Sequence, residues 1–406
     1  MRVRTWLADK QPLLRWGVRL FFLAAALVLA AGGPLPSLLA GVFPGASPLA
    51  VLGGGLAGRA WYAGFFWGVL PLFFLALAVW RGRFFCRWVC PTGTLYEIPR
   101  KVSLRRPLLR QRLNGILFWA VVSSAVVGAP LFLVLDPLAA FSRPTTLLSR
   151  TYTAAALIPG LVVPVFFLVS FVQPALWCTH LCPLGYMFDL SHRNDRRGAR
   201  RPDRLRRSIT GGLLLGIPVA AGSRLASSIG SRSESEAAIM PPGAENQARF
   251  AGLCSRCYAC VNVCPTKVIG VHFPDDRAVY TWFQPQLMPE RGYCEEFCNR
   301  CTQVCPTGAL KPWSIEEKRG RQIGVARVRR TACLGWADGQ HCMVCQEFCP
   351  YHAIDTDESK QGIPRPVVRP DVCRGCGVCQ NECPAIRDGV AIVVRGQRQQ
   401  KEAVDA

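Results

Sequence analysis

The chain has 406 residues, room for two or three domains, and a formal net charge of +22. Residues 1–223 hold 25 Lys/Arg and 6 Asp/Glu, a balance of +19, whereas residues 224–406 hold 23 and 20, a balance of +3. The basic excess therefore belongs to the more apolar half, where it indicates membrane topology and not a phosphate-binding surface. Nucleic acid is excluded as a partner on this ground.

Four long uncharged stretches in the first half predict membrane-spanning helices. A bilayer core of roughly 30 Å takes about 20 helical residues. The stretches cover residues 20–40, 60–80, 113–135 and about 154–176. Lys/Arg-rich segments precede the first stretch, separate the second from the third and follow the fourth. We therefore expect the N-terminus and these segments to lie in the cytoplasm.

Two pairs of cysteines follow the second and fourth stretches, as CRWVCP and CTHLCP. The residues are Cys86, Cys90, Cys178 and Cys182. On a helix, C-x3-C places both sulfurs on one face, and the following proline ends or bends the helix. Both pairs fall on the predicted cytoplasmic side. They are interpreted either as a further iron–sulfur site or thiol relay near the quinone, or as reduced structural thiols.

A shorter apolar segment, residues 208–229, follows an arginine-rich run and is either a fifth transmembrane helix or a signal-like segment. Export of the second half through it is the expectation, and an interfacial hairpin that leaves this half in the cytoplasm is the alternative. Residues 230–248 have the composition of a linker.

The second half contains sixteen cysteines in four segments, each ending in Cys-Pro. The segments are CSRCYACVNVCP from Cys254, CEEFCNRCTQVCP from Cys294, CLGWADGQHCMVCQEFCP from Cys333 and CRGCGVCQNECP from Cys373. The first and last keep the bacterial ferredoxin spacing C-x2-C-x2-C-x3-C-P. Zinc ribbons lack the repeated third cysteine, and disulfide scaffolds have no reason to repeat one spacing four times. The pattern predicts four [4Fe-4S] clusters.

In two-cluster ferredoxins the cysteine before proline binds the neighbouring cluster. This rule predicts four quartets, which we number as sites. Site I is Cys254, Cys257, Cys260 and Cys305; site II is Cys294, Cys298, Cys301 and Cys264; site III is Cys333, Cys342, Cys345 and Cys383; site IV is Cys373, Cys376, Cys379 and Cys349.

The predicted fold is an α-helical membrane domain of four to five transmembrane helices, followed by a small α+β domain of two tandem two-[4Fe-4S] ferredoxin-like modules. The boundaries are 1–207 for the membrane domain, 208–229 for the fifth segment, 230–248 for the linker, 249–313 and 314–396 for the two modules, and 397–406 for a tail. No nucleotide or flavin motif occurs, and no substrate-converting catalytic site is predicted.

The segments RGRFFCRWVCPTGTLYE and QPALWCTHLCPLGYMFDL resemble the NapH and MauN membrane ferredoxin-type proteins. The region from about residue 206 to the end, with its CLGWADGQHCMVCQEFCP segment, resembles the NapG and MauM polyferredoxins. The resemblance implies a fusion of the two types in the bacterial inner membrane, multi-pass, with a periplasmic ferredoxin domain. Its implied partners are lipid, quinone and a periplasmic redox protein.

The resemblance further implies a function. Electrons from quinol would pass through four [4Fe-4S] clusters, and a fifth iron–sulfur site if the membrane cysteines hold one, to a periplasmic redox enzyme or its maturing cofactor. The alternatives are a maturation or assembly factor for a periplasmic dehydrogenase or reductase, and an iron–sulfur redox sensor.

Overall fold

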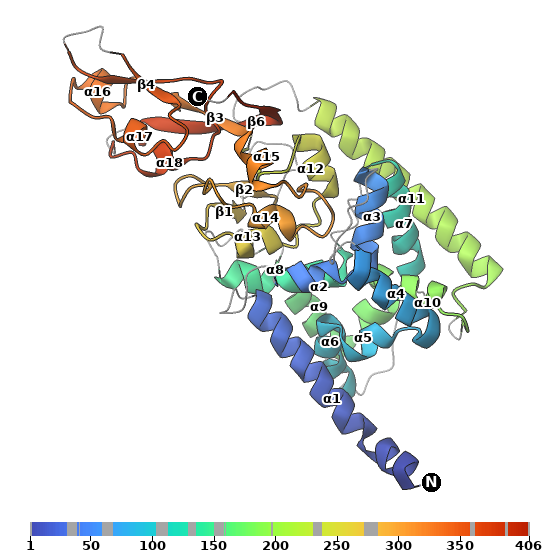
Figure 1. The fold of residues 1–406 in the computed structure, drawn as a ribbon. Coiled ribbons are helices and arrows are strands. Elements are labelled where there is room, and N and C mark those ends of the chain that lie inside the picture. The colour runs from blue at the N-terminus through green and yellow to red at the C-terminus, as the bar shows by residue number, and fades with distance from the viewer. Residues whose placement is uncertain are drawn as a thin grey trace.

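The structure, a computed structural model, describes residues 2–30, 39, 41–58, 68–102, 113–128, 135–149, 158, 160–195, 198–229, 238–271, 283–357, 362–385 and 389–404. We call residues 1–229 the apolar half and residues 238–404 the cysteine-rich half. The described part of the apolar half is helical, whereas the cysteine-rich half combines short helices with three small sheets (Figure 1).

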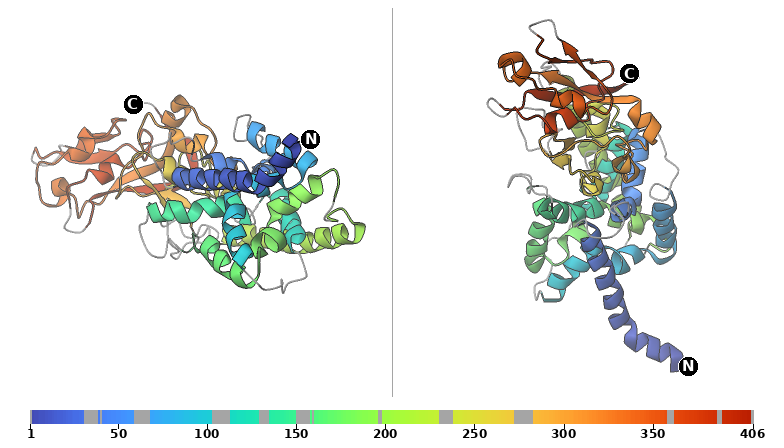
Figure 2. Two further views of the ribbon diagram at one scale, coloured as in Figure 1. Left: turned by 90° about the horizontal axis from the view of Figure 1, so that it is seen from below. Right: turned by 60° about the vertical axis from the view of Figure 1, so that its left-hand side comes forward.

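Helices of very different length build the apolar half. They are α1 (Arg2–Ala30), α2 (Val42–Gly45), α3 (Pro48–Gly58), α4 (Leu70–Arg81), α5 (Phe84–Trp88), α6 (Pro91–Val102), α7 (Asn114–Val126), α8 (Pro137–Ser149), α9 (Val162–Val172), the π-helix η5 (Trp177–Leu181), α10 (Pro183–Ser191) and α11 (Pro202–Ile229). Helix α1 projects from the body of the protein, and α11 runs along its outside (Figures 1 and 2).

One helix in the described part of the chain is long and apolar enough to cross a bilayer, within α1 over Leu13–Ala30. Four other apolar helical segments are shorter: Pro48–Ala57, Leu70–Arg81, Asn114–Val126 and Val162–Val172. The last three lie inside the predicted spans, whose remaining parts include residues outside the described ranges. The predicted number of four to five transmembrane helices therefore stays a prediction.

Helix α11 packs closely along α7 through small residues. A Cβ atom at Gly212 would lie 2.3 Å from the Cβ of Trp119, and one at Gly216 would lie 2.7 Å from the carbonyl oxygen of Ala120. The hydroxyl of Ser123 donates to the carbonyl of Gly212 at 3.1 Å. Such close backbone approach through small residues is typical of packed membrane helices. Segment 208–229 is thus part of a longer helix packed into the apolar half.

Short elements build the cysteine-rich half around its sulfur atoms. They are α12 (Gln247–Leu253), α13 (Ala259–Val263), β1 (Ile269–Val271), β2 (Pro285–Leu287), α14 (Arg300–Gln303), α15 (Ile315–Arg319), β3 (Arg321–Val328), α16 (Leu334–Ala337), α17 (Val344–Glu347), β4 (Ile354–Asp357), β5 (Arg365–Val368), α18 (Val378–Asn381) and β6 (Ile392–Glu402). Three antiparallel pairs form: β1 with β2, β3 with β6 and β4 with β5.

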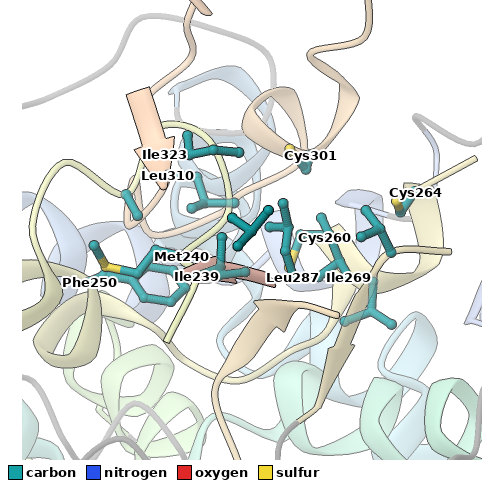
Figure 3. Packing of buried hydrophobic residues seen from close by; sticks show 14 of the residues in the cluster. Ile239, Met240, Phe250, Cys260, Cys264, Ile269, Leu287, Cys301, Leu310 and Ile323 are labelled. Atoms are coloured by element: carbon teal, nitrogen blue, oxygen red, sulfur yellow. The ribbon is translucent and has the colours of Figure 1, made fainter. Parts of the chain in front are cut away.

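The core of the first module is apolar and includes cysteines of two predicted sites. Figure 3 shows Cys260, Cys264 and Cys301 among Ile269, Leu287 and other buried side chains. Ile239 and Met240 lie in the same cluster, 7% and 2% exposed. The predicted linker 230–248 therefore needs correction, because its described part, from residue 238, packs into the module.

The two modules are fastened together by the C-terminal strand. Strand β6 pairs with β3 as far as Glu402 opposite Arg321, so the predicted tail 397–406 begins as strand. The side chain of Gln400 donates to the carbonyls of Met240 and Pro241 at 3.3 and 2.9 Å. The end of the second module thus binds the start of the first, and the tail prediction is corrected accordingly.

Candidate metal centres

In the first module, cysteines that the cross-assignment groups into one site are electrostatic neighbours of one another. The pKa of the Cys257 thiol is raised to about 12, chiefly by burial and in smaller part by the charges of Cys305 and Cys254. The pKa of Cys301 is likewise raised by burial and then by Cys294, Cys264 and Cys298. Such coupling requires nearby sulfurs. Sites I and II each include the Cys-Pro cysteine of the other segment.

The second module repeats this exchange, and its quartets line two cavities. Both cavities are small and partly open to solvent. One is lined by all four cysteines of site III, the other by all four of site IV. Among the described residues no group of three His, Cys, Asp or Glu side chains is close enough to hold a single metal ion.

The residues fit a [4Fe-4S] cluster at each site. A cubane takes four cysteine thiolates, and four cysteines line each cavity of the second module. Burial raises the pKa of Cys345 and of Cys376 to about 12, so their thiolates are unfavourable unless a metal compensates the charge. When bound, the clusters would supply one-electron redox chemistry.

The four sites follow one another in a line. Cys260 of site I neighbours Cys301 of site II, and Cys379 of site IV neighbours Cys345 of site III. Between the modules, the amide of Cys294 in site II donates to the carbonyl of Cys376 in site IV at 2.8 Å. The spatial order is therefore I, II, IV, III, which differs from the order of the segments in the sequence.

The binding loops of sites I and IV share an unusual backbone. In site IV, Gly375 and Gly377 have φ angles of 73° and 91°. The matching positions of site I carry Arg256 and Tyr258, with φ angles of 55° and 61°. The left-handed region costs a residue with a Cβ roughly 1–2 kcal/mol, so it persists only where the surroundings impose it. The left-handed backbone of the site I loop must therefore be stabilised by surrounding contacts, which the glycines of the site IV loop do not require.

The four cysteines of the apolar half also come together. Each of Cys90, Cys178 and Cys182 has two other members of the quartet among its electrostatic neighbours, and Cys86 is a neighbour of all three. Cys178 lies on the π-helix η5, a form of helix that is rare and frequent at functional sites. We call Cys86, Cys90, Cys178 and Cys182 the apolar-half quartet.

The two C-x3-C-P motifs have the same local structure because each Cys-Pro begins a helix. Proline is favoured at a first helical position, and α6 and α10 start at Pro91 and Pro183. The sulfur of Cys90 accepts from the amide of Gly93 at 3.4 Å, and the sulfur of Cys182 accepts from the amide of Gly185 at 3.3 Å. A helix N-terminus favours the thiolate that a metal requires.

A buried ion pair connects these two motifs. Arg83, just before the first motif, donates to both carboxylate oxygens of Asp189 at 2.8 and 2.7 Å and to the carbonyl of Cys178 at 2.7 Å. Arg83 and Asp189 are 8% and 7% exposed. Breaking a buried pair of this kind is strongly destabilising. The pair therefore fixes the distance between the two halves of the quartet.

Sequence reasoning missed the polar residues that fasten the cysteine loops. Lys318 is 6% exposed, and its ammonium donates to the carbonyls of Glu295, Glu296 and Cys298 in the site II loop. Arg143 and Ser142 bind the site I loop in the same manner. All three lie far from the cysteine segments that they support, and no spacing in the sequence marks them.

Two families of iron–sulfur domains match the parts of the chain that contain the cysteine quartets. The family described as "4Fe-4S dicluster domain" matches residues 253–309 and 340–386, which contain fifteen of the sixteen cysteines of sites I to IV, all but Cys333. The family described as "4Fe-4S binding domain" matches residues 63–114 and 155–202, which contain the apolar-half quartet. No solved structure matches the chain.

Related proteins match part of the chain. The methylamine utilization ferredoxin-type protein MauM of Methylorubrum extorquens is 31% identical over 193 residues, 44% of this chain and 84% of MauM. The ferredoxin-type protein NapG of Escherichia coli K12 is 34% identical over 164 residues, 37% of this chain and 69% of NapG. NapF of the same organism is 28% identical over 151 residues, 36% of this chain and 80% of NapF.

Paired ferredoxin folds with four cysteine quartets define an iron–sulfur protein of the electron-transfer class. Two proteins of that class, MauM and NapG, are more than 30% identical to this chain, and the matched region covers more than two thirds of each of them. The chain belongs to the family of ferredoxin-type proteins that includes MauM and NapG.

Proposed function

We propose that this chain anchors itself in a membrane through its apolar half and carries electrons from quinol to a redox protein on the outer side. The observation that carries the anchoring is the distribution of exposed apolar side chains. Of the 33 exposed large hydrophobic residues in the described part of the chain, 29 lie between residues 13 and 225. Of these 29 residues, 21 lie on α1, α4, α9 and α11. Lipid is the partner that covers such a surface.

A lipid-embedded quartet calls for a lipid-soluble donor. Oxidation of one quinol releases two electrons and two protons and leaves quinone. Sites I, II, IV and III form a row of neighbours, which suits one-electron transfer toward the far end of the cysteine-rich half. This line of sites supports conduction over a sensing role. The match of the apolar half to a 4Fe-4S binding domain supports the interpretation as a NapH/MauN-type domain fused to a NapG/MauM-type polyferredoxin.

The contacts of α3 support a placement of the cysteine-rich half on the outer side of the membrane. Helix α3 contacts this half, and it lies in the connection between the first and second predicted spans, opposite to the Lys/Arg-rich segments. The close packing of α11 on α7 supports a retained fifth helix over a cleaved signal. We therefore place the cysteine-rich half in the periplasm.

One experiment tests the proposal as a whole. Spheroplasts expressing the chain with a C-terminal tag are treated with protease, and anaerobic membranes are then incubated with a short-chain quinol and followed by EPR. We expect the tag to be cleaved in intact spheroplasts and reduced-cluster signals to appear with quinol. A protected tag would contradict the periplasmic placement. Clusters that dithionite reduces but quinol does not would contradict the donor.

A further inference from the structure

Helix α8 touches redox-active cysteine loops at two places. At its start, the hydroxyl of Thr92, two residues after Cys90, donates to the carbonyl of Pro137 at 2.9 Å. Six residues later, Arg143 binds the site I loop. A helix rises about 1.5 Å per residue, so these contacts are about 9 Å apart along α8. The apolar-half quartet and site I therefore approach the same short helix.

Arg143 and its neighbour hold the site I loop by three of its carbonyl groups. Arg143 is 1% exposed, and its guanidinium donates to the carbonyls of Arg256 at 3.1 Å and Ser255 at 3.0 Å. The hydroxyl of Ser142 donates to the carbonyl of Cys257 at 2.8 Å. These bonds fix the stretch that carries the left-handed residue Arg256. They explain why site I tolerates a backbone that site IV builds from glycine.

A second contact holds the remaining cysteine of site I. Cys305 lies between Val304 and Thr307, and both of these touch the apolar half. A Cβ atom at Gly41 would lie 3.0 Å from the carbonyl oxygen of Val304, and one at Gly54 would lie 2.5 Å from that of Thr307. Backbone thus packs on backbone with no room for a side chain. Both chain segments that form site I, the loop from Cys254 to Cys260 and the segment around Cys305, are therefore packed against the apolar half.

The chain also anchors site I to α1. The amide of Asn262, two residues after Cys260, donates to the carbonyl of Ala30 at 2.9 Å and to the hydroxyl of Thr146 at 2.8 Å. Ala30 ends α1, and Thr146 lies on α8. Ala139 of α8 belongs to the hydrophobic core of the cysteine-rich half. Among the four sites, site I therefore lies at the interface between the two halves of the chain. Site III lies at the other end of the order I, II, IV, III.

We propose that site I receives electrons from the apolar-half quartet across α8, and that Arg143 is the positioning residue that holds site I there. The direction of transfer rests on the proposed function. The quartet would hold an iron–sulfur cluster as the one-electron donor: each electron that site I gains would be lost by that cluster, and quinol would reduce the cluster again. The order of transfer is then I, II, IV, III, and the outer partner takes the electron at site III.

The buried charge of Arg143 should affect the midpoint potential of site I, a quantity that a purely structural role of Arg143 would leave unchanged. Arg143 is near enough to Cys254 and Cys257 to favour their thiolates electrostatically. A nearby cation favours the more negative, reduced form of a cluster. Arg143→Met should therefore shift the midpoint potential of one cluster to more negative values and leave those of the other clusters unchanged. Arg143→Lys, which keeps the charge, should restore most of that potential.

The experiment uses the full chain in detergent. Wild type, Arg143→Met, Arg143→Lys, Gly54→Ala and the control Gly222→Ala are compared by EPR-monitored redox titration and by stopped-flow reduction with a short-chain quinol or with dithionite. A Cβ at Gly222 would meet nothing within 4 Å. We expect quinol reduction to slow about tenfold or more in Arg143→Met and Gly54→Ala, because docking bonds or contacts are lost. Reduction by dithionite and the Gly222→Ala protein should stay at wild-type values.

The outcomes separate the two proposals. If quinol fails to reduce even the wild-type clusters, the proposed donor is wrong, and the potential of one cluster in Arg143→Met still decides the role of Arg143. If the wild type is reduced by quinol and both Arg143→Met and Gly54→Ala are reduced equally fast, site I is not the receiving site. Unchanged potentials of all clusters in Arg143→Met would refute the positioning role.

Discussion

Lys318 should hold the site II loop with a stability that can be measured. Its ammonium, 6% exposed, donates to Cys298 at 2.6 Å and to Glu296 at 3.4 Å, and also to Glu295. A hydrogen bond to a charged group contributes about 1.5–3 kcal/mol. Lys318→Met loses two such bonds, but methionine also avoids the desolvation cost of a buried ammonium. The free energy of unfolding should therefore fall by about 3 kcal/mol. For a domain of this size that corresponds to about 6–12 °C in the melting temperature.

The assay is the anaerobic thermal loss of iron–sulfur absorbance, with iron content determined before heating. Lys311→Met is the matched control, because Lys311 pairs with Glu245 at the surface and is 37% exposed. A pair of that kind contributes less than about 1 kcal/mol. Equal losses in the two variants, or a wild-type melting temperature for Lys318→Met, would refute the reasoning from buried carbonyl contacts.

Three further variants test other parts of the structure. The wild type should bind about twenty iron atoms, and Cys178→Ser should lose about four of them by mass spectrometry, whereas equal contents would show that the apolar-half quartet holds no cluster. Gly212→Leu should destabilise the detergent-solubilised chain by about 1–3 kcal/mol, because the new side chain overlaps α7, and Gly222→Leu should not. Gly375→Ala should lose the site IV iron, because its φ is +73° and a Cβ would lie 2.4 Å from backbone, whereas Gly320→Ala, with nothing nearer than 3.7 Å, should keep it.

The cysteine quartets were predictable because their chemistry is local. Three ligands of a cluster come from one short loop, so a spacing such as CRGCGVC carries the information, and the fourth follows from the pairing of two segments. Chain ends and connections were not predictable, because the buried positions of Met240 and Gln400 depend on segments far away in the sequence.

The pairing of the two C-x3-C-P motifs could be foreseen only in outline. Identical C-x3-C-P spacing indicated that four thiols belong together, but the pair Arg83–Asp189 that joins them spans 106 positions. In the same way, Arg143 served as one more basic residue in a charge count, although the structure buries it beneath site I. Long-range polar contacts of this kind leave no periodic signal.

From the sequence alone one learns which sulfurs form quartets and that half of the chain is unusually apolar, since ligand spacing and composition are written residue by residue. The spatial order of the sites is a different kind of property. It arises because the amide of Cys294 meets the carbonyl of Cys376 and because α8 holds the loop of site I. Packing between distant segments decides these contacts, so only the folded chain shows where its row of metal sites begins and where it ends.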